Sequence, residues 1–202
     1  MGVAEKNIAL VTRPDAGHTF LTVDTGNTCG VSASPFVGDC DYDQAGAILK
    51  WKLEAPGQHE TGKYVVFDQS PFATGFGNGL SSEGVVYIPE ACAKKDGCRL
   101  HIALHGCEQN REEVGKAFIE GSGFARWADA NRFVILFPQV SANPLLNPKG
   151  CWVAVKELST FLKPALNRVT GEDYLTKDAP QIAAIWRMVE HLAKRPVAME
   201  TK

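Results

Sequence analysis

The sequence predicts an α/β fold in which a mostly parallel sheet is covered by helices on both faces. Two continuous apolar runs, "CRLHIALHGC" and "RFVILFPQ", stand on either side of a helical pattern, and a second helical pattern follows them. Continuous apolar runs are typical of strands that are buried on both faces, and the order strand, helix, strand, helix is typical of a parallel sheet. A chain of 202 residues is long enough for one domain over residues 1–202.

The N-terminal part of the chain is expected to form a strand, a loop and a short helix. The segment "NIALVTR" (7–13) is apolar and β-prone, and it ends in a Pro-Asp-Ala-Gly turn that leads to His18. Residues 24–41 are rich in Gly, Ser, Asp and Asn, which predicts a loop. Asp41 and Gln44 have the spacing of a capping box, so a helix is expected to follow them.

The middle of the chain supplies further strands and one long helix. The segments "GKYVVFDQSPF" (62–72) and "GVVYIPEAC" (84–92) are candidate strands, and "RFVILFPQ" (132–139) is a buried one. Between the two buried strands, apolar residues recur at helical spacing over roughly 111–130. The inner face of this predicted helix carries Val114, Phe118, Phe124 and Trp127.

The last third of the chain contains a long connection and a C-terminal helix. Residues 141–177 are longer than most connections in a compact domain, which makes them a candidate functional segment. Asp178 is placed to cap the helix "APQIAAIWRMVEHLAK". The apolar stripe of this helix is expected to consist of Ile182, Ile185, Val189 and Leu192.

The overall composition argues against several classes of partner. The net charge is −2, the hydrophobic fraction is 45% and the charged fraction is 22%, values that are typical of globular proteins. No run of like charges indicates a nucleic-acid or anionic-membrane partner. No apolar stretch approaches the ~18 residues that a membrane span requires, and the N-terminal residues do not have the pattern of an export signal.

The six cysteines predict disulfides and an oxidising compartment. They show no CxxC motif and no histidine at zinc spacing, so no metal site is expected. Six cysteines allow 15 connectivities, of which proximity along the chain favours Cys29–Cys40, Cys92–Cys98 and, by remainder, Cys107–Cys151. The alternative is six free thiols in a cytosolic protein. Cysteines of the disulfide type without an export signal suggest that the start of the protein is missing.

The first chemical candidate is the loop "LHGC" (104–107), which follows a buried strand. In an open parallel sheet the reactive groups lie in loops beyond the carboxyl ends of the strands. Gly106 allows the backbone to approach a substrate closely, and the N–H of Cys107 would donate to a developing oxyanion, a contribution of about 3 kcal/mol when the donor is preorganised. The alternative is an ordinary strand-to-helix turn.

The second chemical candidate is His18 in the loop "RPDAGHTF". A neutral imidazole on a loop, with Gly17 beside it for clearance, suits a general base that must reach a hydroxyl. The alternative is a histidine on a surface loop. His101 and His105 alternate along the strand that leads into the first candidate loop, so at least one of them is expected to face the core.

The sequence contains no convincing serine nucleophile. A G-x-S-x-G elbow presents an exposed serine after a buried strand, whereas "GVSAS" (30–34) lacks the final glycine and Ser122 in "EGSGFA" lies inside a predicted helix. The serine and the acid of a catalytic triad are therefore expected outside this chain.

Four segments together resemble the circularly permuted poly(3-hydroxybutyrate) depolymerases, exported esterases with the α/β-hydrolase fold. They are "DAGHTF", "DCDYDQAGAILKW", "LHIALHGCEQN" with "FARWADANRFVILFPQ", and "NPKGCW" with "YLTKDAPQIAAIWRMVEHLA". The resemblance implies a partial α/β-hydrolase fold without the nucleophile-bearing segment and a secreted or periplasmic location. It also implies that His18 is the triad histidine, that the Cys107 N–H is an oxyanion donor and that the disulfides are those above. It implies no metal or organic cofactor.

The substrate implied by the resemblance is a polyester or a related short-chain hydroxyalkanoate ester. Trp152 is expected to line the groove for the acyl group or polymer, or alternatively to be a core tryptophan. The residues after Trp152, "VAVKELSTFLKPALNR", are more aliphatic and charged than the aromatic platform that is usual in this family. Two other hypotheses stay open: a polyester-binding module without catalytic activity, and a gene fragment without independent function.

Overall fold

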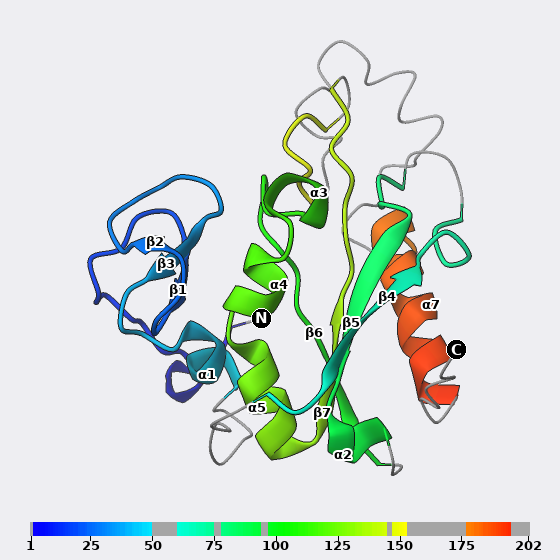
Figure 1. Ribbon diagram of the computed structural model, residues 1–202, viewed down its shortest axis with the longest axis horizontal. Coiled ribbons are helices and arrows are strands. Elements are labelled where there is room, and N and C mark those ends of the chain that lie inside the picture. The colour runs from blue at the N-terminus through cyan, green and yellow to red at the C-terminus, as the bar shows by residue number, and fades with distance from the viewer. Residues whose placement is uncertain are drawn as a thin grey trace.

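The computed structural model describes residues 2–49, 60–74, 78–93, 97–144, 147–152 and 177–194. These residues form a small three-stranded sheet and a larger four-stranded sheet. In Figure 1, helices α4 and α5 lie between the two sheets, and α7 lies on the opposite side of the larger sheet. The predicted α/β class, with helices on both faces of a sheet, is therefore confirmed.

The small sheet is entirely parallel and carries the N-terminal loops. Its strand order is β1-β3-β2, and it packs against helix α1. The elements of this part are the 3-10 helix η1 (Glu5–Asn7), β1 (Phe20–Thr22), β2 (Asn27–Thr28), β3 (Val37–Asp39) and α1 (Gln44–Leu49). The disulfide Cys29–Cys40 joins the loop after β2 to the end of β3.

Helix α1 is capped by Asp43 rather than by the predicted Asp41. One carboxylate oxygen of Asp43 accepts from the Gly46 N–H (2.7 Å), and the other accepts from the Trp127 indole N–H (2.8 Å). Asp41 has a positive φ of 50°, and the Gln44 side chain accepts from the Leu21 N–H (2.7 Å) instead of reaching back to a cap. A single carboxylate thus begins α1 and ties it to α5.

The larger sheet is mixed. Its order is β4-β5-β7-β6; β6 and β7 are parallel, whereas β5 runs antiparallel to both of its neighbours. Of the five strand pairings in the described residues, three are parallel. The four strands are β4 (Lys63–Asp68), β5 (Glu83–Ile88), β6 (Arg99–Ile102) and β7 (Phe133–Phe137). The sheet therefore has a parallel pair at one side, β6 and β7, and an antiparallel part formed by β4 and β5.

Helices cover both faces of the larger sheet and form two core layers. The first layer packs β5 and β7 against the buried aromatic residues Phe118, Phe124 and Trp127, as predicted, and the second packs β5 and β7 against Met188 of α7. The helices are α2 (Glu90–Ala93), α3 (Arg111–Val114), α4 (Ala117–Gly121), α5 (Phe124–Asn131) and α7 (Pro180–Lys194). Helix α7 buries Ala184 and Met188, whereas the predicted stripe residue Ile182 is exposed.

Two predicted elements differ in the structure. The segment 7–13 is not a strand, and its apolar side chains Ile8, Leu10 and Val11 are exposed because no strand of the described residues pairs with it. The predicted helix over 111–130 is divided into α3, α4 and α5, since Gly115 and Gly123 adopt positive φ angles of 60° and 81°. Of the long connection 141–177, residues 145–146 and 153–176 lie outside the described residues.

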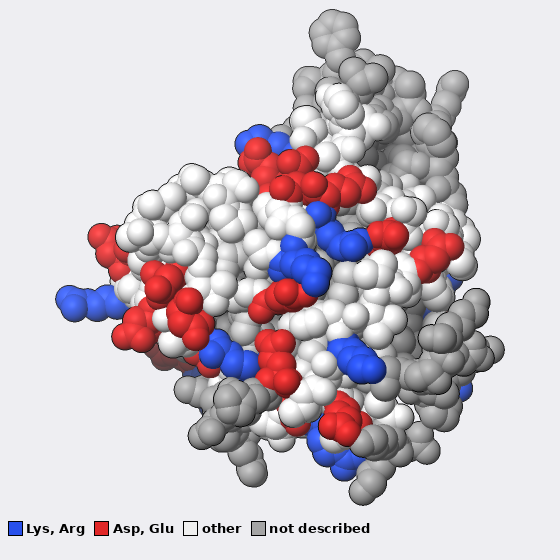
Figure 2. Space-filling model, in the orientation of Figure 1, with Lys and Arg blue, Asp and Glu red and all other residues white. Residues whose placement is uncertain are grey.

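All six cysteines form disulfides: Cys29–Cys40, Cys92–Cys98 and Cys107–Cys151. These are the pairs that proximity along the sequence favours. Within the described ranges, no helix is long and apolar enough to cross a membrane, and no group of His, Cys, Asp or Glu side chains has the arrangement of a metal site. On the face drawn in Figure 2, Lys and Arg side chains lie among Asp and Glu side chains.

Candidate functional site

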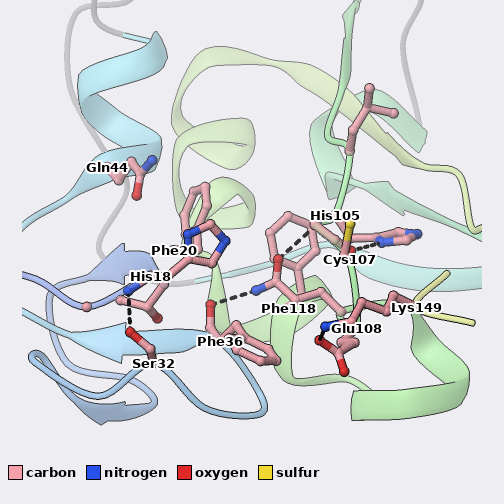
Figure 3. Close-up of a pocket in the computed structure, with 15 residues that line it drawn as sticks. His18, Phe20, Ser32, Phe36, Gln44, His105, Cys107, Glu108, Phe118 and Lys149 are labelled. Carbon is pink, nitrogen blue, oxygen red and sulfur yellow. Dashed lines mark hydrogen bonds and ion pairs between the residues drawn. The ribbon is translucent and has the colours of Figure 1, made fainter. Parts of the chain in front are cut away.

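Two segments that are far apart in the sequence meet at one pocket. The first carries His18 and runs into β1; the second is the loop that follows β6 and contains Cys107. The pocket has a volume of about 810 Å³. In Figure 3, His18 and Ser32 lie on one side, and Cys107 lies on the other. The structure thus brings together the two groups that the sequence predicts as base and oxyanion donor.

The backbone around His18 is fixed, while its imidazole ring is exposed. The His18 N–H donates to the Ser32 hydroxyl (2.7 Å), and the Gly17 N–H donates to the Cys29 carbonyl (2.8 Å). A Cβ at Gly17 would lie 2.8 Å from both Ser32 Oγ and the Val31 carbonyl carbon, so this close approach requires glycine. Among the described residues the His18 ring has no hydrogen-bond partner. The ring is therefore held in place by its backbone and is available to a reacting group.

The loop after β6 is organised by His105, which is buried. Its Nδ1 lies 2.7 Å from the Gly106 carbonyl, and its Nε2 lies 3.2 Å from the Val140 nitrogen. Because a carbonyl only accepts and a backbone N–H only donates, Nδ1 must carry the proton and Nε2 must be unprotonated. Burial lowers the pKa of His105, in agreement with this neutral tautomer.

The bond to the Gly106 carbonyl also orients the Cys107 N–H. In a planar trans peptide the carbonyl of one residue and the N–H of the next point in opposite directions. The Gly106 carbonyl is held by His105, so the Cys107 N–H points away from the His105 nitrogen. No described residue accepts a hydrogen bond from the Cys107 N–H, and Cys107 lines the pocket.

Two further connections hold this N–H in a fixed position. The next amide, that of Glu108, donates to the Lys149 carbonyl (2.7 Å), and the disulfide Cys107–Cys151 joins the loop to the segment that carries Lys149. A donor that is fixed before the reaction can stabilise an oxyanion without a reorganisation cost.

Trp152 contacts this loop from outside the pocket. Its indole N–H donates to the His105 carbonyl (2.9 Å), and its ring lies 5.2 Å from the His105 ring between centroids. Trp152 is half-buried and is not among the residues that line the described cavity. In this structure Trp152 therefore supports His105; its predicted contact with an ester stays a prediction.

Several lining residues were not singled out from the sequence as site residues. Phe20 and Phe36 supply aromatic surface beside Phe118, which was predicted as a core residue, and Glu108 and Lys149 form an ion pair at the pocket (3.2 Å). Phe36 and Lys149 lie far from the candidate loops in the sequence, and no catalytic motif marks them. Their proximity comes from the packing of β3 and of the segment 147–152 against the loop after β6.

The serines of the described residues do not form an elbow beside His18. Ser32 lines the pocket, but its hydroxyl accepts from the His18 backbone, and in Figure 3 the His18 ring lies away from it. Ser122 is only 2% exposed and ends α4. No described serine hydroxyl is hydrogen-bonded to the His18 ring.

The chain is similar to two curated depolymerases. It is 38% identical over 164 residues to a polyhydroxybutyrate depolymerase from Talaromyces funiculosus, an alignment that covers 72% of this chain and 48% of the relative. It is 35% identical over 185 residues to a poly(3-hydroxybutyrate) depolymerase from Delftia acidovorans, covering 88% of this chain and 34% of the relative. The chain belongs to the polyhydroxybutyrate depolymerase family. No family model matches it.

Two solved depolymerase structures share the fold. The PHB depolymerase from Penicillium funiculosum superposes with a TM-score of 0.82 at 33% identity, covering 94% of this chain and 61% of that one. A serine-to-alanine variant of a PHB depolymerase in complex with an R3HB trimer superposes with a TM-score of 0.81 at 32% identity, covering 95% and 61%. The chain thus spans about half the length of the Talaromyces depolymerase and a third of that from Delftia.

Proposed function

We propose that this chain supplies the catalytic base and the oxyanion donor of a serine esterase that hydrolyses poly(3-hydroxybutyrate) or related short-chain hydroxyalkanoate esters. In the complete protein the serine and the aspartate would come from polypeptide outside this chain. The observation that carries the proposal is the meeting of His18 and the Cys107 N–H at one pocket. The family membership supports the choice of an ester as substrate.

In this proposal His18 is the proton carrier. It takes the proton of the serine hydroxyl as the serine oxygen attacks the ester carbonyl, and it returns the proton to the leaving alcohol as the C–O bond breaks. A water molecule then attacks the acyl-serine while His18 takes a proton from it, and His18 returns this proton to the serine oxygen as the acyl C–O bond breaks and the hydroxy acid leaves. The Cys107 N–H donates to the tetrahedral oxyanion in both halves of the reaction, a contribution of about 3 kcal/mol to each transition state.

The walls of the pocket support an uncharged ester. Phe20, Phe36, Phe118 and Leu104 offer apolar surface for the methyl groups of a hydroxybutyrate chain. The charges of Glu108 and Lys149 are paired with each other. One of the matched solved structures is a complex with an R3HB trimer, which supports a short oligomer as a ligand. The proposal includes a contact between Trp152 and the acyl group or the polymer.

We also propose that the complete protein is secreted or periplasmic. Residues 1–202 would be part of a single domain in it. The three disulfides support this location, since disulfides persist in oxidising compartments.

A second function, polyester binding without catalysis, is favoured by one observation. The His18 ring has no serine partner among the described residues, so the pocket could hold an ester without cleaving it. In that case the isolated chain would bind hydroxybutyrate oligomers, and His18→Ala would leave the binding unchanged.

A chimera tests the proposed function. The part of the Talaromyces depolymerase that this chain does not match would be joined to this chain, and release of 3-hydroxybutyrate from polymer films would be measured. We expect the chimera to hydrolyse the polymer and His18→Ala to reduce kcat at least about 10³-fold, because removing one triad member typically costs 10⁴-fold or more.

The controls separate chemistry from folding. His101→Ala changes a histidine of strand β6 that does not line the pocket, and it should retain activity within about tenfold. The isolated chain should show no turnover of p-nitrophenyl butyrate and no labelling by a serine-reactive phosphonate. A folded chimera that hydrolyses the polymer equally well with His18→Ala would contradict the proposed role of His18.

A further inference from the structure

A buried glutamine connects the two walls of the pocket. Gln109 is 7% exposed and lies just after the loop that carries Cys107. Its side-chain oxygen accepts from the Gly106 N–H (2.8 Å), and its amide nitrogen donates to the Phe36 carbonyl (2.6 Å) and more weakly to the Pro35 carbonyl (3.3 Å). One side chain therefore links the loop after β6 to the loop before β3 by hydrogen bonds.

These bonds form a continuous path between the two catalytic groups. The Phe36 carbonyl that accepts from Gln109 also accepts from the Phe20 N–H (2.8 Å), two residues after His18. On the other side, Gly106 directly precedes Cys107. Three hydrogen bonds, two of them made by Gln109, thus span the interval from Gly106, which precedes the proposed oxyanion donor, to strand β1, which begins two residues after His18.

The hydrogen bond of Gln109 is accommodated by a glycine at position 106. A Cβ at Gly106 would lie 2.7 Å from the Gln109 side-chain oxygen, so a larger residue there would displace the end of the Gln109 side chain. A buried polar group that loses its hydrogen-bond partner destabilises the folded arrangement around it. Shortening Gln109 or removing its polar atoms would leave both the Gly106 N–H and the Phe36 carbonyl without this bond.

We propose that Gln109 is a positioning residue that sets the spacing between His18 and the Cys107 N–H. Gln109 lines the pocket, but its side-chain oxygen and nitrogen are bonded to the two walls, so we expect it to act through them rather than on the substrate. The structural part of this inference is that Gln109 holds the two walls of the pocket together, and it does not depend on the proposed function. The catalytic part is that this spacing affects the reaction, and it rests on the proposed function. Small displacements of catalytic groups, of the order of 1 Å, can cost about 10²-fold in rate.

The structural part is tested in the isolated chain by amide hydrogen exchange. Gln109→Met keeps the side-chain length and removes all three hydrogen bonds. We expect the Gly106 and Phe20 amides to exchange at least about tenfold faster than in the wild-type chain, after correction for the change in global stability. The matched control is Gln69→Met, which makes the same change at a buried glutamine that bonds Ser81 and Gln139 away from the pocket.

The catalytic part is tested in the chimera by measuring kcat and KM separately. Gln109→Met should lower kcat about 10–100-fold with little change in KM, because it misplaces groups that act in the transition state. Gln69→Met should lower the melting temperature without this effect on kcat.

Gln109→Glu adds a pH readout. The ionised carboxylate accepts from Gly106 but cannot donate to Phe36, whereas the protonated carboxyl can do both. The activity of this variant relative to wild type should therefore rise as pH falls through the pKa of the new carboxyl.

The outcomes separate the two proposals. Faster exchange of Gly106 and Phe20 together with a loss in kcat supports the positioning role. Unchanged exchange of both amides in Gln109→Met, or unchanged kcat in an active chimera, overturns it. If the wild-type chimera is folded but inactive, the proposed function fails, and the exchange experiment alone decides whether Gln109 holds the two walls together.

Discussion

The neutral state of His105 follows from its two backbone partners. The Gly106 carbonyl requires a proton on Nδ1, and the Val140 N–H requires a lone pair on Nε2. A second proton on the ring would have to displace the Val140 N–H, because that group cannot accept. His101 is also partly buried, with its ring packed 5.1 Å from the Phe124 ring, and burial lowers the pKa of His101 as well.

These two histidines predict a loss of stability in mild acid. In the unfolded chain they titrate near the ordinary histidine value of 6.5, whereas in the folded protein their pKa values lie below it. The unfolded state therefore binds more protons in this window, and the free energy of unfolding decreases as pH falls below 6.5 towards the folded pKa values. Urea unfolding at several pH values between about 5 and 8 measures the slope.

A double variant isolates the histidine contribution from other groups. Glu60, whose pKa is raised by burial, acts in the opposite direction at lower pH, so the total slope alone is not diagnostic. In His101→Gln with His105→Asn, the asparagine amide can still donate to the Gly106 carbonyl but does not titrate. The slope between pH 7 and 5 should become shallower; an unchanged slope would contradict the assignment.

Residue types and neighbouring glycines marked His18 and Cys107 as separate candidates, and the family resemblance implied that they act together; both line one pocket. Each follows a turn or strand end with an adjacent glycine that permits close approach. Gln109 was not predictable, because its two key partners are 3 and 73 residues away and only the folded chain brings them together. Trp152 was predicted as a substrate contact, yet its indole N–H is bonded to the His105 carbonyl.

At the scale of elements, the long apolar runs were predicted correctly because burial on both faces leaves a clear signal. Strands β5 and β7 are buried along most of their length, whereas β6 also follows an apolar run but none of its residues is fully buried. The core aromatic residues of α4 and α5 were identified. The segment 7–13 was predicted wrongly because a β-prone sequence forms a strand only beside a partner strand. The predicted helix over 111–130 is divided because two glycines adopt positive φ angles. The spacing of apolar residues contains no information on these angles.

The three disulfides should contribute to stability in the order of the loops that they close. The sequence separations are 44 for Cys107–Cys151, 11 for Cys29–Cys40 and 6 for Cys92–Cys98. From the chain entropy of the unfolded state, replacing each pair by alanine should cost about 4, 3 and 2 kcal/mol respectively. Denaturant unfolding of the three double variants measures this order.

The Cys107–Cys151 pair should also have an effect that the other two lack. This disulfide holds the loop that bears the proposed oxyanion donor, so its loss should lower kcat in the chimera as well as stability. The Cys92–Cys98 pair joins α2 to the start of β6, away from the pocket, and serves as the matched control. An equal loss of kcat in both variants would contradict this distinction.

At the scale of the whole molecule, His18 and Cys107, the two parts of the proposed catalytic site, line one pocket. The walls come from the small sheet and from the loop after β6, and helices α4 and α5 pack between the two sheets. Within the described residues, β6 pairs with β7 alone, so its other edge is open. The matched depolymerase structures have 39% of their length outside the superposed part, since 61% is covered.

The fold class and the family could be predicted from the sequence because four separate segments resemble the family and occur in the family's order. The position of the nucleophile could not, since no serine within the described ranges has the surroundings of an elbow. The central claim is therefore that His18 and the Cys107 N–H act on an ester bound to a serine from the remainder of the complete protein.

The most direct test is a crystal structure of the chimera after reaction with a p-nitrophenyl phosphonate ester, which leaves a tetrahedral phosphonate on the nucleophile. The proposal predicts a label on a serine of the Talaromyces part, with a phosphonate oxygen about 2.7–3.1 Å from the Cys107 nitrogen. The His18 ring should lie within hydrogen-bond distance of the labelled serine oxygen. A label on Ser32, or a phosphonate oxygen held by other donors with His18 turned away, would contradict it.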